Sequence, residues 1–291
     1  MPAPDSLSDL RVRYARILGQ LDTLIEYSRE LARRFNGIVP ETKAQVNAAP
    51  IFIKQVCHAI SLRRLMPAQI DGGPRELWDA GSVCALARCV IDAYDALAYF
   101  ALDAVTEEER DFRELLSDLH DQERRTKMLD FIGSTQPEAI TIRANALALR
   151  VRARVHPFFA RVGKTSQQKI AQGDAPQYYL SQRERNQVGG IDHRHYLSAT
   201  IYLSQYVHTT PMAINQWRHF KAGGINEVRV MMLSMQHALP YFAKGVHAIM
   251  VMFPREDEVP QTVADVLDFW LPVAEGGVPG RGPDPRSAST S

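Results

Sequence analysis

Apolar residues recur at steps of three and four along almost the whole of this 291-residue chain. In the stretch 6–34, for example, Leu10, Tyr14, Ile17, Leu21 and Leu24 fall on one face of a helix. Alternation of apolar and polar residues, which would predict strands, is nearly absent. The pattern therefore predicts an all-α fold, a bundle of about 8–10 helices.

Caps, glycines and prolines divide the chain into helices predicted at 6–34, 41–48, 50–65, 75–104, 106–132, 137–157, 192–207, 211–217, 226–252 and 259–271. Pro50 is expected to begin a new helix. Residues 165–191, polar and rich in Gln and Gly, are predicted to form one long, partly ordered loop or mobile lid. Residues 276–291 are predicted to be a disordered tail, which leaves residues 1–275 as a single helical domain.

Charge and composition argue against several classes of protein. With 34 basic and 33 acidic residues, the formal net charge is +1, which does not suit the whole molecule to nucleic acid or an anionic membrane. No segment is long and uncharged enough to span a bilayer, so no membrane partner is predicted. The three cysteines have neither zinc spacing nor an even count, which favours a reduced, cytoplasmic location. No cofactor motif is present, and no cofactor is predicted.

Three residues, Arg88, Asp92 and Asp95, supply all the charge of segment 81–102 and share one helical face. Solvated helix faces usually carry Lys and Glu instead. One interpretation is a lined cleft or a buried ion-pair network. The other is an ordinary solvated face on which Arg88 and Asp92 form an i,i+4 ion pair.

A second polar group occurs on the predicted helix 192–207 and just beyond it. Ser204 and His208 continue the stripe of Leu197 and Ile201, so His208 is expected to point inward, with Ser204 in position to orient its ring. Tyr202 is one of several phenols expected to contact the charged face of 81–102. The alternative is a core histidine satisfied by Ser204 or by a backbone carbonyl.

Basic residues gather in segment 139–173, which has seven Lys and Arg residues and no acid. Four of them, Arg143, Arg150, Arg154 and Arg161, share one face of a helix if it continues past Pro157. This face is interpreted as an anion-binding or nucleic-acid-binding surface. The alternative is ion pairing with the acidic residues of the preceding helix.

The segments Gly81–Ala93 and Tyr202–Pro211 together resemble a family of uncharacterised bacterial all-helical proteins. That family shows small-x-x-x-Leu-x-Arg-x-x-x-acidic on one helix and Leu-Ser-x-x-x-His on a later one, and the resemblance covers about the middle half of the chain. It implies that Arg88, Asp92, Ser204 and His208 meet in space, although Asp92 stands where the family has Glu. It implies no established activity.

A weaker resemblance is to the HEPN helical nucleases, which pair an Arg and a His four to six residues apart on one helix. No Arg stands at that spacing before His208, so Arg88 would supply the guanidinium from another helix.

The first functional hypothesis is metal-independent cleavage of a phosphoester, with RNA or a phosphate-bearing small molecule as substrate. His208 would act as general acid or base, Arg88 would stabilise charge on the phosphorane, and Asp92 would hold Arg88. Asp95, Tyr202 and Ser204 would complete the site.

Two alternatives stay open. One is a non-enzymatic interaction or ligand-binding module whose polar cluster is structural, with the Met-rich helix 230–252 as the surface of a homodimer. The other is a metal-dependent oxidase or hydrolase, for which the sequence has no Glu-x-x-His pairs. Only a site assembled from Asp92, Asp95, His120 and His208 would serve that last hypothesis.

Overall fold

The computed structural model describes residues 7–35, 38–70, 78–208, 210–221, 223–254 and 257–276. Over these residues the chain forms eleven α-helices and two short helical segments of other types, with no strand, which confirms the all-α prediction. None of these helices combines the length and the apolar character needed to cross a bilayer. The predicted disordered tail lies, apart from Gly276, outside the described residues.

The helices group into two compact units, the first made of residues 1–102 and 186–291 and the second of residues 103–185. The first unit is interrupted in sequence by the second. The prediction that residues 1–275 form a single domain stays a prediction, because compactness alone does not show whether two units fold independently.

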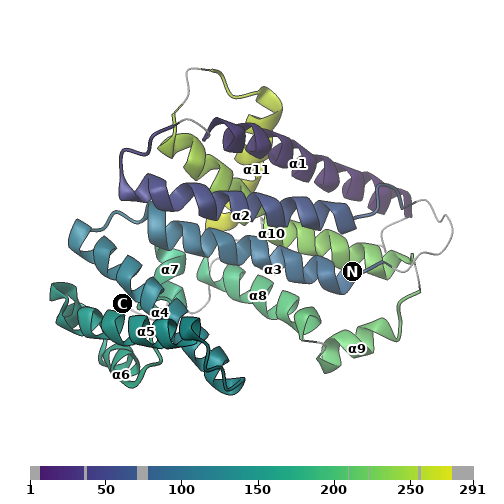
Figure 1. Cartoon of the computed structure of the whole chain (residues 1–291). Coiled ribbons are helices and arrows are strands. Elements are labelled where there is room, and N and C mark those ends of the chain that lie inside the picture. The colour runs from purple at the N-terminus through teal and green to yellow at the C-terminus, as the bar shows by residue number, and fades with distance from the viewer. Residues whose placement is uncertain are drawn as a thin grey trace, which may run out of the picture. The chain divides into compact units, whose positions relative to one another are not determined.

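The first unit consists of α1 (Leu7–Arg34), α2 (Lys43–Leu65), α3 (Ala80–Leu97), the π-helical segment η1 (Ala98–Leu102), α8 (His193–Val207), α9 (Pro211–Trp217), α10 (Ile225–Met252) and α11 (Gln261–Gly276). α3 packs against α2, α8 and α10 (Figure 1). Its buried face is rich in small residues, including Ala80, Cys84 and Ala87. Small side chains let neighbouring helix axes approach closely, so α3 forms the centre of this unit.

α2 is one continuous helix, whereas the sequence predicted a break at Pro50. Proline leaves the carbonyl four residues earlier, here that of Val46, without its usual helical partner. Both residues are exposed, so water can take the place of the missing N–H. Thr42 and Gln45 form a capping box that fixes the start of the helix at Lys43.

The Met-rich helix α10 lies in the interior of the first unit, with more than half of its 28 residues buried. It packs against α1, α2, α3 and α11. Its methionines Met231 and Met235 are fully buried. The apolar residues of segment 230–252, which predicted a dimer surface, are therefore largely part of the core of this unit.

The second unit consists of α4 (Glu107–Phe131), α5 (Pro137–Val155), the 3-10 turn η2 (Pro157–Arg161) and α6 (Lys164–Gln172), with α7 (Gln182–Val188) spanning the boundary to the first unit. Phe112, Leu116, Phe158 and Ile170 are among the residues of its small core. Arg113 lies in the same unit and is 2% exposed.

The range 165–191 was predicted to be one long loop, but the structure has α6 and α7 there. Ile170 is fully buried and anchors α6, and Gly173, with a φ of 78°, ends it in the left-handed conformation. Ser181 and Glu184 exchange side-chain and backbone hydrogen bonds at the start of α7. The polar composition concealed both helices because each needs few apolar anchors.

Candidate functional site

The charged face of α3 meets α8 through Arg88. The Arg88 guanidinium donates through Nε to both oxygens of Asp92, at 2.9 and 3.1 Å, and through Nη2 to Tyr196 Oη at 3.3 Å. It also lies over the Tyr196 ring, with Cζ 5.7 Å from the ring centre. The i,i+4 pair predicted from the sequence is present, and the phenol that joins it is Tyr196.

Two histidines and a tyrosine form ring contacts between α8 and α10. His195, which is 4% exposed, stacks on the buried Tyr241 ring with centroids 6.0 Å apart and planes 18° apart. Its ring also lies 6.1 Å from that of His237. Asp95, on the same face of α3 as Arg88, is buried and helps to raise the pKa of Tyr241, for which burial is the main cause.

His208 does not point inward as predicted. It is exposed and follows the last helical residue of α8, where its backbone N–H donates to Ser204 O. Leu197 and Ile201, which were expected to mark the inner face, are 40% and 60% exposed. α8 instead buries the face that carries Tyr196, Ala199, Thr200 and Leu203.

Tyr202 and Ser204 are only partly buried. The Tyr202 ring lies 5.7 Å from that of His237 and 5.4 Å from that of Tyr206. Burial and a hydrogen bond with Tyr206 raise the pKa of Tyr202 well above its usual value. Of the six residues predicted to form the site, Arg88 and Asp92 are in direct contact in the structure, and no contact joins either of them to His208 among the described residues.

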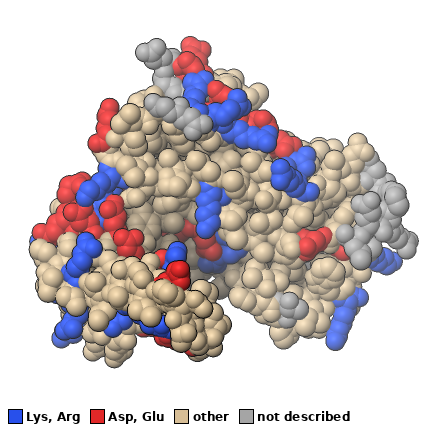
Figure 2. Space-filling view, in the orientation of Figure 1, with Lys and Arg blue, Asp and Glu red and all other residues tan. Residues whose placement is uncertain are grey.

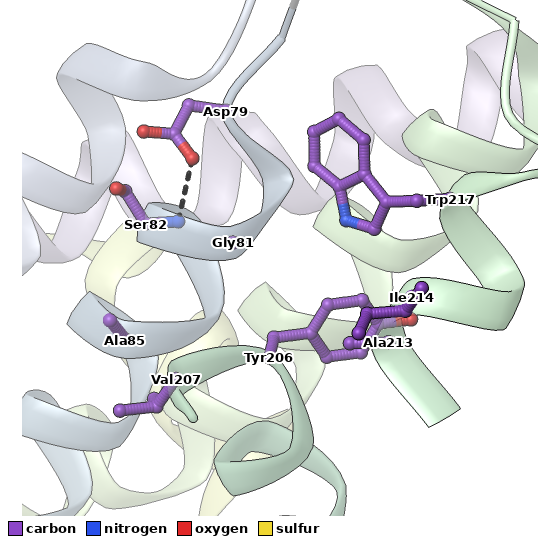
Figure 3. A pocket seen from close by; sticks show the side chains of 9 residues that line it. All are labelled: Asp79, Gly81, Ser82, Ala85, Tyr206, Val207, Ala213, Ile214 and Trp217. Carbon is purple, nitrogen blue, oxygen red and sulfur yellow. Dashed lines mark hydrogen bonds between the residues drawn. The ribbon is translucent and has the colours of Figure 1, made fainter. Parts of the chain in front are cut away.

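A pocket of about 520 Å³ opens at the N-terminal end of the same face of α3 (Figure 3). From α3 and its cap it is lined by Asp79, Gly81, Ser82 and Ala85. From α8 and α9 it is lined by Tyr206, Val207, Ala213, Ile214 and Trp217. Two of its members, Gly81 and Ala85, share a helical face with Arg88 and Asp92, since the four follow one another at steps of three and four residues.

Local caps and contacts position the pocket walls. Asp79 is the N-cap of α3 and accepts a hydrogen bond of 2.9 Å from Ser82 N, which fixes the start of this helix at Ala80. The predicted start at residue 75 lies outside the described residues. Tyr206 Oη donates to the Gln216 amide oxygen and so ties α9 to α8. Trp217, 41% exposed, lies across the pocket from Asp79 (Figure 3).

The four arginines of the predicted anion-binding surface belong to the second unit. Three of them pair with acids of α4: Arg143 with Asp130 at 2.8 Å, Arg150 with Glu123 at 2.9 Å, and Arg161 with Glu108 at 3.9 Å. Arg154 is exposed and has no acidic partner among the described residues. The pairing alternative thus accounts for three of the four, and the anion-binding role stays a prediction.

The described residues contain no group of three or more His, Cys, Asp and Glu side chains placed to hold a metal ion. His120, which the metal-dependent hypothesis needed, lies in the second unit with Nδ1 2.7 Å from Ala175 O. The metal-dependent hypothesis therefore finds no ligand set in this part of the chain.

We expect the stability of the protein to fall as the pH is lowered through the range set by His237. Burial, with a further contribution from His195, lowers the pKa of His237 from 6.5 to about 4. Between these values the unfolded chain binds the proton and the folded chain does not, so its contribution is complete above pH 6.5 and is lost toward pH 4. The difference corresponds to about 3 kcal/mol.

Urea denaturation at a series of pH values measures this effect. His237→Gln should flatten the rise of the unfolding free energy between pH 4 and 6.5, whereas the control His208→Gln, at an exposed histidine, should leave it unchanged. Equal slopes in the wild type and His237→Gln would contradict the assignment.

Sequence reasoning missed Asp79, Trp217 and the His195–His237 pair. Asp79 precedes a run of small residues, which is an N-cap signal, but the charged face of α3 gave no sign that a pocket would form there. His195 and His237 lie on helices that are apolar on several faces, so periodicity could not tell which side is buried.

In comparisons with known proteins, the chain matches no family model, no curated protein and no solved structure.

Proposed function

We propose that the first unit is a non-enzymatic module that binds a small organic cation, a molecule with an apolar body and a positively charged amine, in the pocket between α3, α8 and α9. The observation that carries the proposal is the pocket lining: two aromatic rings and several aliphatic side chains around a single carboxylate, that of Asp79. Its volume of about 520 Å³ falls in the range of small-molecule sites.

The charge of the lining selects the ligand. The Asp79 carboxylate accepts one hydrogen bond, from Ser82 N, and pairs with no Lys or Arg among the described residues. It therefore keeps acceptor capacity for an ammonium group. Trp217 supplies the aromatic ring on which a cation binds best. An anionic ligand would face the Asp79 charge without a basic side chain from the lining to offset it.

The polar cluster around Arg88 supports a structural role in this module. Arg88 is already engaged by Asp92 and Tyr196, and a guanidinium held in this way joins α3 to α8. Phosphoester cleavage would need a general acid or base close to Arg88. The predicted candidate, His208, is exposed at the end of α8, which favours the binding module over the hydrolase.

A matched set of three probes tests the proposal by isothermal titration calorimetry: 4-phenylbutylamine, 4-phenylbutanol and 4-phenylbutyrate. The three share an apolar body and differ in the charge of the head group. We expect the amine to bind tightest, by about tenfold over the alcohol, and the carboxylate to bind weakest. Asp79→Asn should remove the preference for the amine and still cap α3, because Asn is also a good N-cap.

Trp217→Ala should weaken binding of the amine by at least about tenfold, since it removes the largest ring of the pocket. The control is Phe269→Ala, at a half-exposed aromatic residue on α11 that does not line the pocket. Absence of binding, equal affinity for the three probes, or binding insensitive to Trp217→Ala would overturn the proposal.

A further inference from the structure

α5 exposes a long apolar stripe to solvent. Ile140, Leu147, Val151 and Val155 are between 55% and 75% exposed, although each is a large aliphatic residue. The opposite side of the same helix packs inside the second unit through small residues such as Ala146 and Ala153. A contiguous apolar patch on the outer face of a helix marks an interaction surface.

The stripe has the same spacing in both directions. Its members are listed from the N-terminal end as residues 140, 144, 147, 148, 151 and 155, all Ile, Leu, Val or Ala, so successive steps are four, three, one, three and four. A two-fold axis at the centre of an antiparallel helix pair brings each position opposite the position equally far from the centre on the other copy, so a stripe with this symmetry places apolar residues against apolar residues. Ile140 would then face the partner's Val155, and Leu147 would lie beside the axis.

Charge favours the same arrangement. Arg154, on the margin of the stripe, has no acidic partner among the described residues, whereas Arg143 and Arg150 on that margin are paired within the unit. Asp130 lies near the other end of α5, where Arg143 binds it, and remains 55% exposed. An antiparallel copy would bring the partner's Arg154 to this end and add a second cation to Asp130.

The tip of the α4–α5 hairpin extends the apolar surface. Met128, Phe131 and Ile132 are 58%, 90% and 72% exposed and precede α5 by a few residues. Figure 2 shows the surface over α5, at the lower left, as largely uncharged, with charged side chains at intervals. An antiparallel copy would place its Val155 end beside this tip.

We propose that the outer face of α5 is the surface through which two copies of this chain associate, by an antiparallel two-fold pairing of α5 centred between Leu147 and Ala148. The 19 residues of α5 span about 28 Å, so the contact is at the small end of specific interfaces. We therefore expect a dimer that dissociates on dilution, with a dissociation constant on the order of micromolar.

Sedimentation velocity of the full chain over a range of concentrations tests the association. The wild type should move from a mass near 32.7 kDa toward twice that value as the concentration rises. Leu147→Arg should keep the monomer mass throughout, because it places two like charges beside the axis. The control Asn145→Arg makes the same substitution at an exposed residue off the stripe and should still dimerise.

Disulfide cross-linking tests the geometry, in a background with Cys57→Ser and Cys89→Ser. Leu147→Cys should cross-link to itself. Ile140→Cys and Val155→Cys should cross-link only when the two variants are mixed, since antiparallel pairing brings residue 140 of one copy to residue 155 of the other. A wild type that stays monomeric at high concentration, or Ile140→Cys that cross-links to itself, would overturn the proposal.

Discussion

Replacing Arg113 with alanine is expected to lower the unfolding free energy of the protein by about 3–5 kcal/mol. Arg113 is 2% exposed, and its Nη2 atom lies 2.6 Å from Asp103 Oδ2 and 2.5 Å from Glu109 Oε1. Among the described residues, no other Lys or Arg contacts both of these carboxylates. The Arg113 guanidinium also lies 5.6 Å from the centre of the Tyr179 ring. Removing it leaves two largely buried carboxylates beside each other without the charge that offsets them.

The consequence should be local to the helices that the cluster joins. Tyr179 Oη donates to Glu109, so the same carboxylate holds the chain that follows α6 against α4. Hydrogen exchange followed by mass spectrometry should show lost protection over α4 and around Tyr179 in Arg113→Ala. Urea denaturation gives the size of the change.

Arg125→Ala is the matched control, since Arg125 pairs with Asp121 on the same helix but both side chains are about half exposed. An exposed i,i+4 pair contributes only about 0.3–0.5 kcal/mol, so this variant should behave like the wild type. A loss of less than about 1 kcal/mol in Arg113→Ala would show that the cluster does not stabilise the unit.

Fold class and most helix positions could be predicted from the sequence because periodicity and caps are local signals. Thr106 with Glu109 three residues later is a helix-start signal in the sequence, and Thr106 does accept a hydrogen bond from Glu109 N at the start of α4. Pro50 misled the prediction of α2. The free-energy cost of a proline inside a helix depends on whether the carbonyl that loses its helical partner, here that of Val46, reaches water. That property depends on packing and has no sequence signal.

The inner face of α8 could not be predicted in the same way. The helix is apolar on more than one side, and the choice of Leu197 and Ile201 as the buried side followed the larger aliphatic residues. The structure buries Ala199 and Thr200 instead, because the small residues of α3 admit a close neighbour. With this face buried, His208 is exposed to solvent and Tyr196 contacts Arg88. The wrong choice of the buried face of α8 therefore changed the whole predicted site.

Replacing Gly245 with alanine is expected to lower the unfolding free energy of the protein by about 1–3 kcal/mol, the range of a forced repacking in a tight core. A methyl group on Gly245 would lie 2.1 Å from Gln55 Oε1 and 3.0 Å from its Cδ. Gln55 is fully buried and donates through Nε2 to Val90 O at 3.2 Å and to Tyr241 O at 3.1 Å. The amide therefore ties α2 to α3 and α10 and cannot move aside without losing both bonds.

The two residues should be coupled, and urea denaturation of a double-mutant cycle measures the coupling. In a Gln55→Ala background the methyl group finds space, so Gly245→Ala should cost much less there than in the wild type. Gly19→Ala is the control, since no atom lies within 4 Å of its added methyl group and a helical Gly→Ala change then stabilises by roughly 0.5–1 kcal/mol. Equal costs of Gly245→Ala in both backgrounds would mean that α10 itself, and not the Gln55 amide, excludes the methyl group.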